Sequence, residues 1–408
     1  MENGKEKKTE LRINNLNKLF EENFSGGKKY LFSSPGRIEI AGNHTDHNNG
    51  QVVAAAIDLD SLAVVSKTDD MKVNFISTNL NQHIRVDIND LVFKSEEAGQ
   101  TSSLIRGVAF KFVELGYKIG GFNCIVESEV AIGSGLSSSA SIEILVGEIF
   151  NYLFNNNTIG PIELAKIGQF AENDFFGKPC GLMDQLAIAY GGIIGIDFLD
   201  FKNPKVINIH ADLTPFNYSF VIVNTGGSHA DLTDDYASIP KEMNEIAHYF
   251  KQQSLRFIDR DILIKNINPL REIYGDRAIL RAIHFIKENQ RAESIIKLLN
   301  EGDFNGFLQT VNEAGNSSFK WLQNAYSIND EKHQGISLAT ELTKNFFKVN
   351  NTIGATKIHG GGFAGTILSI IQNKLVKEYI AEMENVFGEK SATRVSIRNS
   401  GTNFVKEI

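Results

Sequence analysis

The side chains best suited to chemistry gather in glycine-bearing segments at residues 34–50, 131–140 and 359–365. The first segment places an arginine, two histidines and an aspartate between residues 37 and 47. The second joins an alternating apolar run to a stretch with apolar residues at helical spacing, so we expect a strand, a loop and an amphipathic helix in that order. The third precedes an apolar run at residues 366–371, which predicts a strand near the C-terminus.

The second segment, Gly133-Ser134-Gly135-Leu136-Ser137-Ser138-Ser139-Ala140, could bind an anion. A turn rich in glycine and serine that runs into a helix offers unpaired backbone N–H groups at the positive end of the helix dipole. The phosphates of ATP would fit there. A Walker A loop would need Gly-Lys-Ser/Thr, and a dinucleotide fingerprint would need glycine at position 138, so neither pattern is met. A structural alternative stays open, in which the glycines form a tight turn and the serines cap the helix.

Four segments together resemble the GHMP kinases, a family named for galactokinase, homoserine, mevalonate and phosphomevalonate kinases. The run at residues 133–140 resembles the second motif of that family. Pro35-Gly36-Arg37 through His44-Thr45-Asp46 resembles the first motif of its galactokinase branch, residues 180–185 resemble the catalytic segment, and residues 360–363 resemble the third motif. The segments follow the order of the family and spread over most of the chain.

The resemblance implies an α+β fold of two domains with the active-site cleft between them. We expect an N-terminal domain like ribosomal protein S5 domain 2 at residues 1–205 and a ferredoxin-like C-terminal domain at residues 206–408. It also implies ATP-dependent phosphorylation of the anomeric C1 hydroxyl of galactose, which yields galactose 1-phosphate.

Phosphoryl transfer requires a base, a cation and a metal ion, and the resemblance supplies a residue for each. It makes Asp184 the base and Arg37 the cation that stabilises the transition state, although an aspartate in a loop is more often a turn or cap residue. It assigns Mg²⁺ to Ser139 and Glu172, with ATP as co-substrate. The ATP-binding residues are then Gly133, Ser134, Gly135, Leu136, Ser137, Ser138, Ser139 and Ala140.

Short polar side chains on rigid loops suit the recognition of sugar hydroxyls. By resemblance, the substrate-binding residues are Asn43, His44, Thr45, Asp46, Gly181 and Tyr236. Zinc is a poor alternative for residues 44–47, because the helical His-Glu-x-x-His spacing and cysteine pairs are both missing.

The substrate is less well defined than the chemistry. Galactokinases usually carry a glutamate, which accepts a hydrogen bond from the C6 hydroxyl of the sugar, where this chain has Asn43. Residues 224–236 and the pair Lys241-Glu242 also depart from the family, and the roles of His229, Asp231 and Asp234 stay open. The alternatives are a kinase for galacturonate or a galactosamine derivative, and a sugar and ATP sensor without catalysis. The intact serine run disfavours the sensor.

Periodicity gives the remaining organisation. Residues 161–176 predict a short helix, and residues 242–342 predict a helical region interrupted at Asn268-Pro269 and at Gly275. The 408 residues favour two domains of about 200 residues each, with a boundary near residue 205.

Composition excludes several classes of protein. The net charge of −8 and the absence of a dense basic patch argue against nucleic acid as a partner. The apolar stretches are far shorter than the roughly 20 residues of a membrane helix, and no signal peptide is evident, so we expect a soluble, cytoplasmic protein. The two cysteines, Cys124 and Cys180, are expected to be free thiols. We expect a monomer, although the sequence does not define the oligomeric state.

Overall fold

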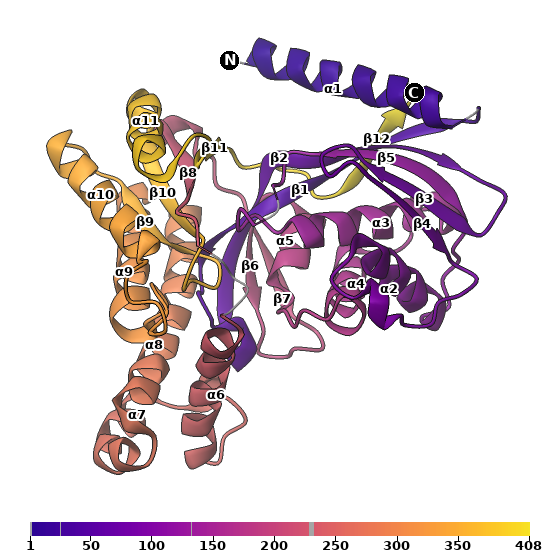
Figure 1. Cartoon of the computed structure of the whole chain (residues 1–408). Helices are drawn as coiled ribbons and strands as arrows, with labels where there is room; N and C mark the ends of the chain where they lie inside the picture. The colour runs from indigo at the N-terminus through magenta and orange to yellow at the C-terminus, as the bar shows by residue number, and fades with distance from the viewer. Residues whose placement is uncertain (1, 25, 132, 228–231) are drawn as a thin grey trace.

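The computed structural model describes residues 2–24, 26–131, 133–227 and 232–408 (Figure 1). The helices are α1 (Glu2–Asn23), α2 (Thr101–Glu114), α3 (Ser138–Phe154), α4 (Pro161–Phe170), α5 (Met183–Tyr190), α6 (Thr233–Tyr249), α7 (Arg260–Lys265), α8 (Ile267–Glu301), α9 (Phe304–Ser317), α10 (Gly335–Val349) and α11 (Val376–Phe387). The strands are β1 (Lys29–Ala41), β2 (Gln51–Lys67), β3 (Lys72–Ser77), β4 (Gln82–Asp87), β5 (Phe122–Ser128), β6 (Ile193–Asp197), β7 (Lys205–Ile209), β8 (Tyr218–Asn224), β9 (Ala355–His359), β10 (Thr366–Gln372), β11 (Ala392–Val395) and β12 (Asn403–Glu407). None of these helices is both long and apolar enough to span a bilayer.

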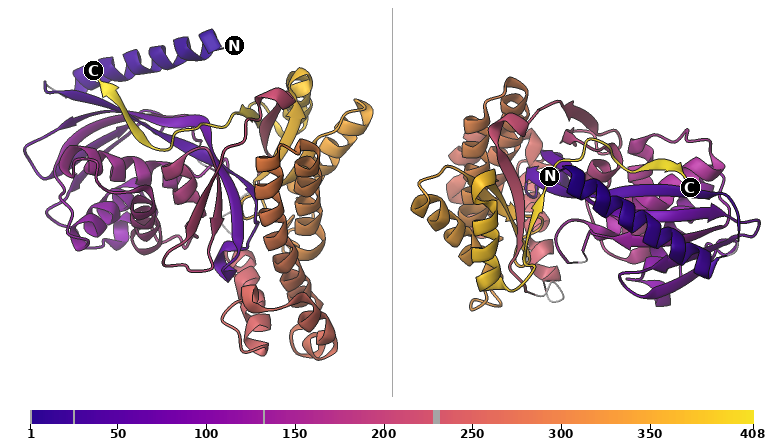
Figure 2. Two further views of the ribbon diagram at one scale, coloured as in Figure 1. Left: turned by 180° about the vertical axis from the view of Figure 1, so that it is seen from behind. Right: turned by 90° about the horizontal axis from the view of Figure 1, so that it is seen from above.

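The first sheet is built around the long antiparallel pair β1 and β2. Its order is β12-β1-β2-β5-β3-β4, with β6 paired to β2 and β7 paired to β6. Among the strand pairs of this sheet that the structure describes, β3 and β5 are parallel and the others are antiparallel. Helices α2, α3, α4 and α5 lie on one face of this sheet, and α1 crosses the other (Figures 1 and 2). Leu16 and Phe20 of α1 are buried against Leu31, Leu62 and Val64, so α1 covers apolar surface that the sheet would otherwise expose.

The second sheet has the order β11-β8-β10-β9, and all its pairs are antiparallel. Helices α10 and α11 cover one of its faces, where Phe346, Tyr379 and Met383 pack against Val221 and Ile367. The helices α6, α7 and α8 extend away from the sheet (Figure 1). They are held together by their own apolar core.

A shared core joins the two halves. Ile38 and Ile40 at the end of β1 are fully buried in one cluster with Ile222 of β8, Ile295 of α8 and Leu368 of β10. Because β1 carries the first polar motif, this packing fixes that motif against elements of the second half.

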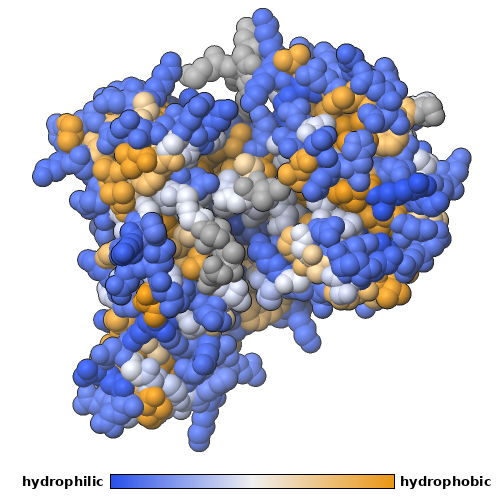
Figure 3. All heavy atoms as spheres, viewed as in Figure 1, coloured by the Kyte–Doolittle hydropathy of each residue, from blue (hydrophilic) through white to orange (hydrophobic). Residues whose placement is uncertain are grey.

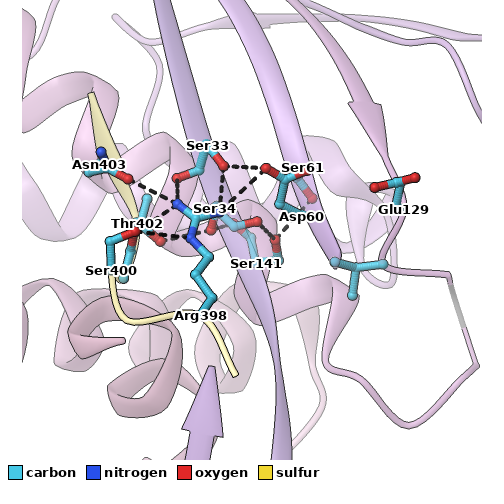
Figure 4. A network of polar contacts seen from close by, with 12 residues as sticks. Ser33, Ser34, Asp60, Ser61, Glu129, Ser141, Arg398, Ser400, Thr402 and Asn403 are labelled. Carbon is cyan, nitrogen blue, oxygen red and sulfur yellow. Dashed lines mark hydrogen bonds and ion pairs between the residues drawn. The ribbon is translucent and has the colours of Figure 1, made fainter. Parts of the chain in front are cut away.

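The C-terminal segment crosses back to the first sheet. Arg398 donates to Ser33 Oγ of β1 at 2.6 Å and to Asn403 Oδ1 at 2.9 Å, and Ser34 Oγ lies 2.8 Å from Thr402 Oγ1 (Figure 4). Beyond this network, β12 pairs with β1. The first sheet therefore contains β12 and nearly all of β7 from the range 206–408, and the boundary near residue 205 stays a prediction.

Most of the expected elements are confirmed. They include the strand and helix that flank the glycine-serine loop, the strand at residues 366–371 and the helical region after residue 242, whose longest helix is broken at Gly275 (φ 76°, ψ 174°). The helix expected at residues 161–176 consists of α4 followed by the π-helical turn η3 (Ala171–Phe176). Both cysteines are free thiols. Helix α1 was not predicted. Strand β1 extends into the first polar motif as far as Ala41, because β2 pairs with it along that length.

Candidate active site

The predicted base and the predicted cation meet in a two-point ion pair. Asp184 lies in the first turn of α5, and Arg37 lies on β1. Arg37 Nε donates to Asp184 Oδ1 at 2.7 Å, and Nη2 donates to Oδ2 at 2.6 Å. The Arg37 side chain is buried, whereas that of Asp184 keeps 26% of its surface exposed. A paired guanidinium fork of this kind fixes the carboxylate and leaves one side of it open to solvent.

Burial by itself would raise the pKa of Asp184. The charge and hydrogen bonds of Arg37, the hydroxyl of Ser137 and the charge of Lys178 outweigh burial and hold that pKa below its ordinary value. Asp184 is therefore a carboxylate at neutral pH and can accept a hydrogen bond or a proton from a bound hydroxyl.

The glycine-serine loop turns sharply into α3. Gly133 and Gly135 have φ of 74° and 71°, and Ser137 also adopts a left-handed conformation with φ 62° and ψ 59°. A Cβ atom at Gly135 would lie 2.5 Å from Thr366 Oγ1, so a side chain there would collide with β10. The loop conformation therefore depends on glycine for both backbone torsion and space.

Among the described residues, no side chain caps the start of α3. Ser137 holds the N-cap position, but its hydroxyl donates to Asp184 Oδ2. The alternative in which the serines cap the helix is thus wrong for Ser137. The first turn keeps its positive end open for an anion, which is the arrangement that phosphate-binding helices use.

The two predicted metal ligands lie side by side. Ser139 Oγ donates to Glu172 Oε1 at 2.7 Å, and Glu172 is only 2% exposed. Hydroxyl and carboxylate oxygens are donors that Mg²⁺ accepts, and it completes its shell with waters and phosphates. Within the described ranges, no group of three or more His, Cys, Asp or Glu side chains could hold a metal ion.

Gln185 and Glu143 extend this polar cluster into the core. Gln185 Nε2 donates to Glu172 Oε2 at 2.8 Å and to Glu143 Oε2 at 3.0 Å. Burial and the charge of Glu172 raise the pKa of Glu143 well above its ordinary value. The sequence reasoning missed both residues, although Gln185 directly follows Asp184 and Glu143 lies about one turn after Ser139 on the same helix.

On the predicted sugar side, Asp46 and Gly181 are in close contact. A Cβ atom at Gly181 would lie 2.0 Å from Asp46 Oδ2, so only glycine fits beside that carboxylate. His44 Nε2 is 2.9 Å from the Gly361 carbonyl oxygen, which assigns the proton to Nε2. Burial, together with His47, lowers the pKa of His44, so the ring is neutral.

Tyr236 packs against the third glycine motif. Its hydroxyl donates to the Gly362 carbonyl at 3.0 Å, and its ring lies where a Cβ atom at Gly361 would stand. Tyr236 and His44 therefore bind neighbouring carbonyls of the same glycine turn. His229 and Asp231 lie outside the described residues, and Asp234 is exposed in the first turn of α6.

Two predicted sugar ligands have their polar groups occupied by the protein. Thr45 is fully buried, and its hydroxyl donates to the carbonyls of Gly42 and Gln51 at 2.9 and 2.7 Å. These bonds hold the turn between β1 and β2. The structure therefore gives Thr45 a role in the turn and offers no free hydroxyl for a sugar.

Asn43 also points into the protein. Its amide nitrogen donates to the Gly360 carbonyl at 2.7 Å and to Glu39 Oε1 at 3.2 Å, and its oxygen accepts from Asn324 at 2.9 Å. Glu39 in turn forms a buried ion pair with Lys357 at 2.5 Å. The expectation that Asn43 faces the C6 position of a sugar is not supported, because this buried network has already taken up its amide.

One concavity lies away from these residues. It has a volume of about 700 Å³ and is lined by both acidic and basic side chains, including Asp197, Lys205, Arg256 and Glu293. The predicted site residues instead lie on β1 and the turn after it, on the loop that leads into α3 and its first turn, on η3, at the start of α5 and on α6. The surface is hollowed between the two halves of the molecule (Figure 3). The predicted site residues therefore do not line this concavity.

Comparison with known proteins identifies the class. Residues 103–192 match the model described as GHMP kinases N terminal domain, and residues 18–67 match the galactokinase galactose-binding signature. The structure resembles the Lactococcus lactis galactokinase complexed with galactose, with a TM-score of 0.81, 24% identity, and coverage of 97% of this chain and 100% of that one. It also resembles the Methanococcus jannaschii mevalonate kinase, with a TM-score of 0.64, 18% identity, and coverage of 91% and 99%. The chain therefore has the two-domain, mixed α/β GHMP kinase fold, as expected.

Curated relatives narrow the class further. A galactokinase of Clostridium acetobutylicum is 31% identical over 384 residues, which cover 93% of this chain and 94% of the relative. A galactokinase of Clostridium perfringens (strain 13 / Type A) is 30% identical over 393 residues, which cover 92% and 94%. The chain belongs to the galactokinase family, and it is an ATP-dependent sugar kinase.

Proposed function

We propose that this kinase transfers the γ-phosphoryl group of ATP to the anomeric C1 hydroxyl of galactose and releases galactose 1-phosphate and ADP. The observation that carries the proposal is the paired fork between Arg37 and Asp184, set beside the uncapped start of α3. The galactokinase relatives, which match nearly the whole chain, support the choice of sugar.

In this mechanism, Asp184 accepts the proton of the C1 hydroxyl while the oxygen attacks the γ-phosphorus and the bond to the β,γ-bridging oxygen breaks. The low pKa of Asp184 makes it a weak base, so the proton moves only as the new P–O bond forms. Arg37 holds the carboxylate in place and places a fixed positive charge near the reacting oxygens, which stabilises the charge of the transition state.

The loop at residues 133–140 is the proposed phosphate site. It leads into the first turn of α3, where backbone N–H groups have no partner within the helix and can bind an anion. Ser139 and Glu172 would hold Mg²⁺, and the ion would neutralise charge on the phosphates when bound. The buried Oε1 of Glu172 accepts from Ser139, so the two oxygens already lie together. A zinc-like set of several strong ligands is not needed for this role.

Asp46, His44, Gly181 and Tyr236 are the proposed sugar-contacting group. Asp46 supplies an acceptor next to Gly181, while the neutral His44 and Tyr236 are held by the turn at residues 360–362. A related sugar is the second candidate, since residues 224–236, which lead to Tyr236, depart from the galactokinase pattern. We also propose that the domains divide near residue 205.

The test is an ADP-release assay with galactose, galacturonate and galactosamine at saturating ATP, with and without Mg²⁺. The expected result is the highest kcat/KM for galactose and no turnover without a divalent ion. Phosphorus NMR of the product should show the phosphate on C1. A phosphate on C6, or a clear preference for another sugar, would contradict the proposed reaction.

A further inference from the structure

Lys178 contacts the same carboxylate oxygen that we assign to the metal. Its Nζ lies 3.0 Å from Glu172 Oε1, the oxygen that also accepts from Ser139. The Lys178 side chain is 63% exposed, whereas Glu172 is almost completely buried. Lys178 follows Gly177, which ends the π-helical turn η3 with φ 82°. A flexible cation thus reaches from solvent onto a buried anion.

Glu172 needs a positive partner when no metal is bound. Among the described residues, its other side-chain contacts come from Ser139, Gln185 and the Cys180 thiol, which are all neutral donors. The same Gln185 nitrogen also donates to Glu143. Arg37, the cation of the nearby ion pair, is already bound to Asp184 and does not neutralise Glu172. An unpaired buried carboxylate is costly, so the ammonium of Lys178 supplies the neutralising charge.

We propose that Lys178 is a placeholder cation, which neutralises Glu172 in the metal-free enzyme and leaves when the metal binds. The ammonium and a divalent ion both require Oε1, and two cations cannot share it at contact distance. This proposal rests on the proposed function, because it takes Glu172 as a metal ligand. Its consequence is that Lys178 disfavours free divalent ions, so the metal enters with ATP.

The exposure of Lys178 makes the exchange possible. Only the tip of the side chain contacts Glu172, and much of the stem lies in solvent, so the ammonium can leave without disturbing the core. Arginine at this position would keep the charge. Methionine would keep the length of the stem and remove the charge, which makes Lys178→Met the informative change.

The experiment titrates Mn²⁺ into nucleotide-free enzyme and measures the free ion by electron paramagnetic resonance. We expect Lys178→Met to bind Mn²⁺ at least about tenfold more tightly than wild type, because a nearby repelling charge is gone. Lys178→Arg should bind like wild type. Lys166→Met, which removes a lysine of α4 that donates to the Lys202 carbonyl, controls for net charge and should also match wild type.

Thermal unfolding in EDTA gives a second readout. Lys178→Met should unfold at a lower temperature than wild type, and saturating Mn²⁺ should remove most of that difference. Equal Mn²⁺ affinity in Lys178→Met and wild type, including no measurable binding by either, would overturn the proposal. A loss of stability that Mn²⁺ does not reverse would also overturn it.

The double variant Lys178→Met with Glu172→Gln separates this proposal from the metal assignment. If the tighter binding of Lys178→Met disappears in the double variant, the ion lies on Glu172 and the proposal stands. If the tighter binding persists, the ion lies elsewhere and both the metal assignment and the placeholder role fail. If Glu172→Gln alone abolishes binding while Lys178→Met changes nothing, only the placeholder role fails.

Discussion

Replacing Asp184 by asparagine removes one negative charge and keeps the size of the side chain. In the wild type, the carboxylate accepts two bonds from Arg37 and one from Ser137. An asparagine oxygen can keep the bond from Arg37 Nε, but its amide group then faces two donors and can accept from neither. The variant therefore loses the base and leaves the buried Arg37 without its counter-ion.

Two magnitudes follow from this geometry. Turnover should fall by at least about 10²-fold, the lower end of what a positioned general base contributes. The free energy of unfolding should fall by about 3 kcal/mol, the lower end for breaking a buried ion pair, since Asp184 is partly exposed. ATP affinity should change little, because Asp184 lies beside the phosphate loop and does not form it.

The assay measures ADP release at saturating ATP and galactose, at a temperature where the variant is folded, together with ATP binding by calorimetry. Ser137→Ala is the matched control, since it removes one bond to the same carboxylate and leaves its charge. Its turnover should fall far less than that of Asp184→Asn. If Asp184→Asn kept turnover within a few-fold of wild type, Asp184 would not be the proton acceptor and Arg37 with positioning alone would carry the reaction.

Three further changes test neighbouring parts of the site. Gly181→Ala should raise KM for the sugar by at least about tenfold at nearly unchanged ATP affinity, because the new Cβ would lie 2.0 Å from Asp46 Oδ2. An unchanged KM would show that Asp46 does not contact the sugar. The folded-state pKa of Asp184 is depressed, so the stability that it contributes is present above its unfolded pKa of about 3.9 and is lost as pH falls through the lower folded value. Protonation of Asp184 should therefore not lower kcat/KM between about pH 5 and 8. A fall of kcat/KM toward acid pH within that range, with a midpoint that Arg37→Lys shifts, would contradict the low pKa. Asn43→Glu should lower the free energy of unfolding by about 3 kcal/mol, because it adds a second carboxylate to the buried network in which Asn43 Nδ2 now donates to Glu39 Oε1 at 3.2 Å. A urea midpoint equal to that of wild type would show that the network adjusts.

The sequence predicted the elements of the site better than their contacts. Local patterns gave the strand, loop and helix around residues 133–140, because alternation, glycine and helical spacing are properties of neighbouring residues. The pairing of Arg37 with Asp184 joins residues that are far apart in the chain, and it followed only from resemblance to the family. The spacing of apolar residues along the chain does not reveal that two such distant residues lie together in the fold.

Asn43 shows where that reasoning failed. The substitution was visible in the sequence, but its partners Glu39, Gly360 and Asn324 come from both halves of the chain. The buried pair of Glu39 with Lys357 spans the same interface. A buried amide turns toward whichever groups satisfy it, so its direction depends on tertiary neighbours that one sequence does not reveal.

Ser137 links the base to the phosphate loop. A left-handed conformation at a residue with a Cβ costs about 1 kcal/mol, and the missing helix cap costs about 1 kcal/mol more. The hydroxyl gains a charge-assisted bond to Asp184, and the same turn lets Leu136 accept from the Arg37 backbone at 3.2 Å. Ser137, in this strained conformation, therefore both fixes the carboxylate of Asp184 and leaves the start of α3 uncapped. Because one side chain serves both, the position of the base is tied to the shape of the loop that would hold the phosphates.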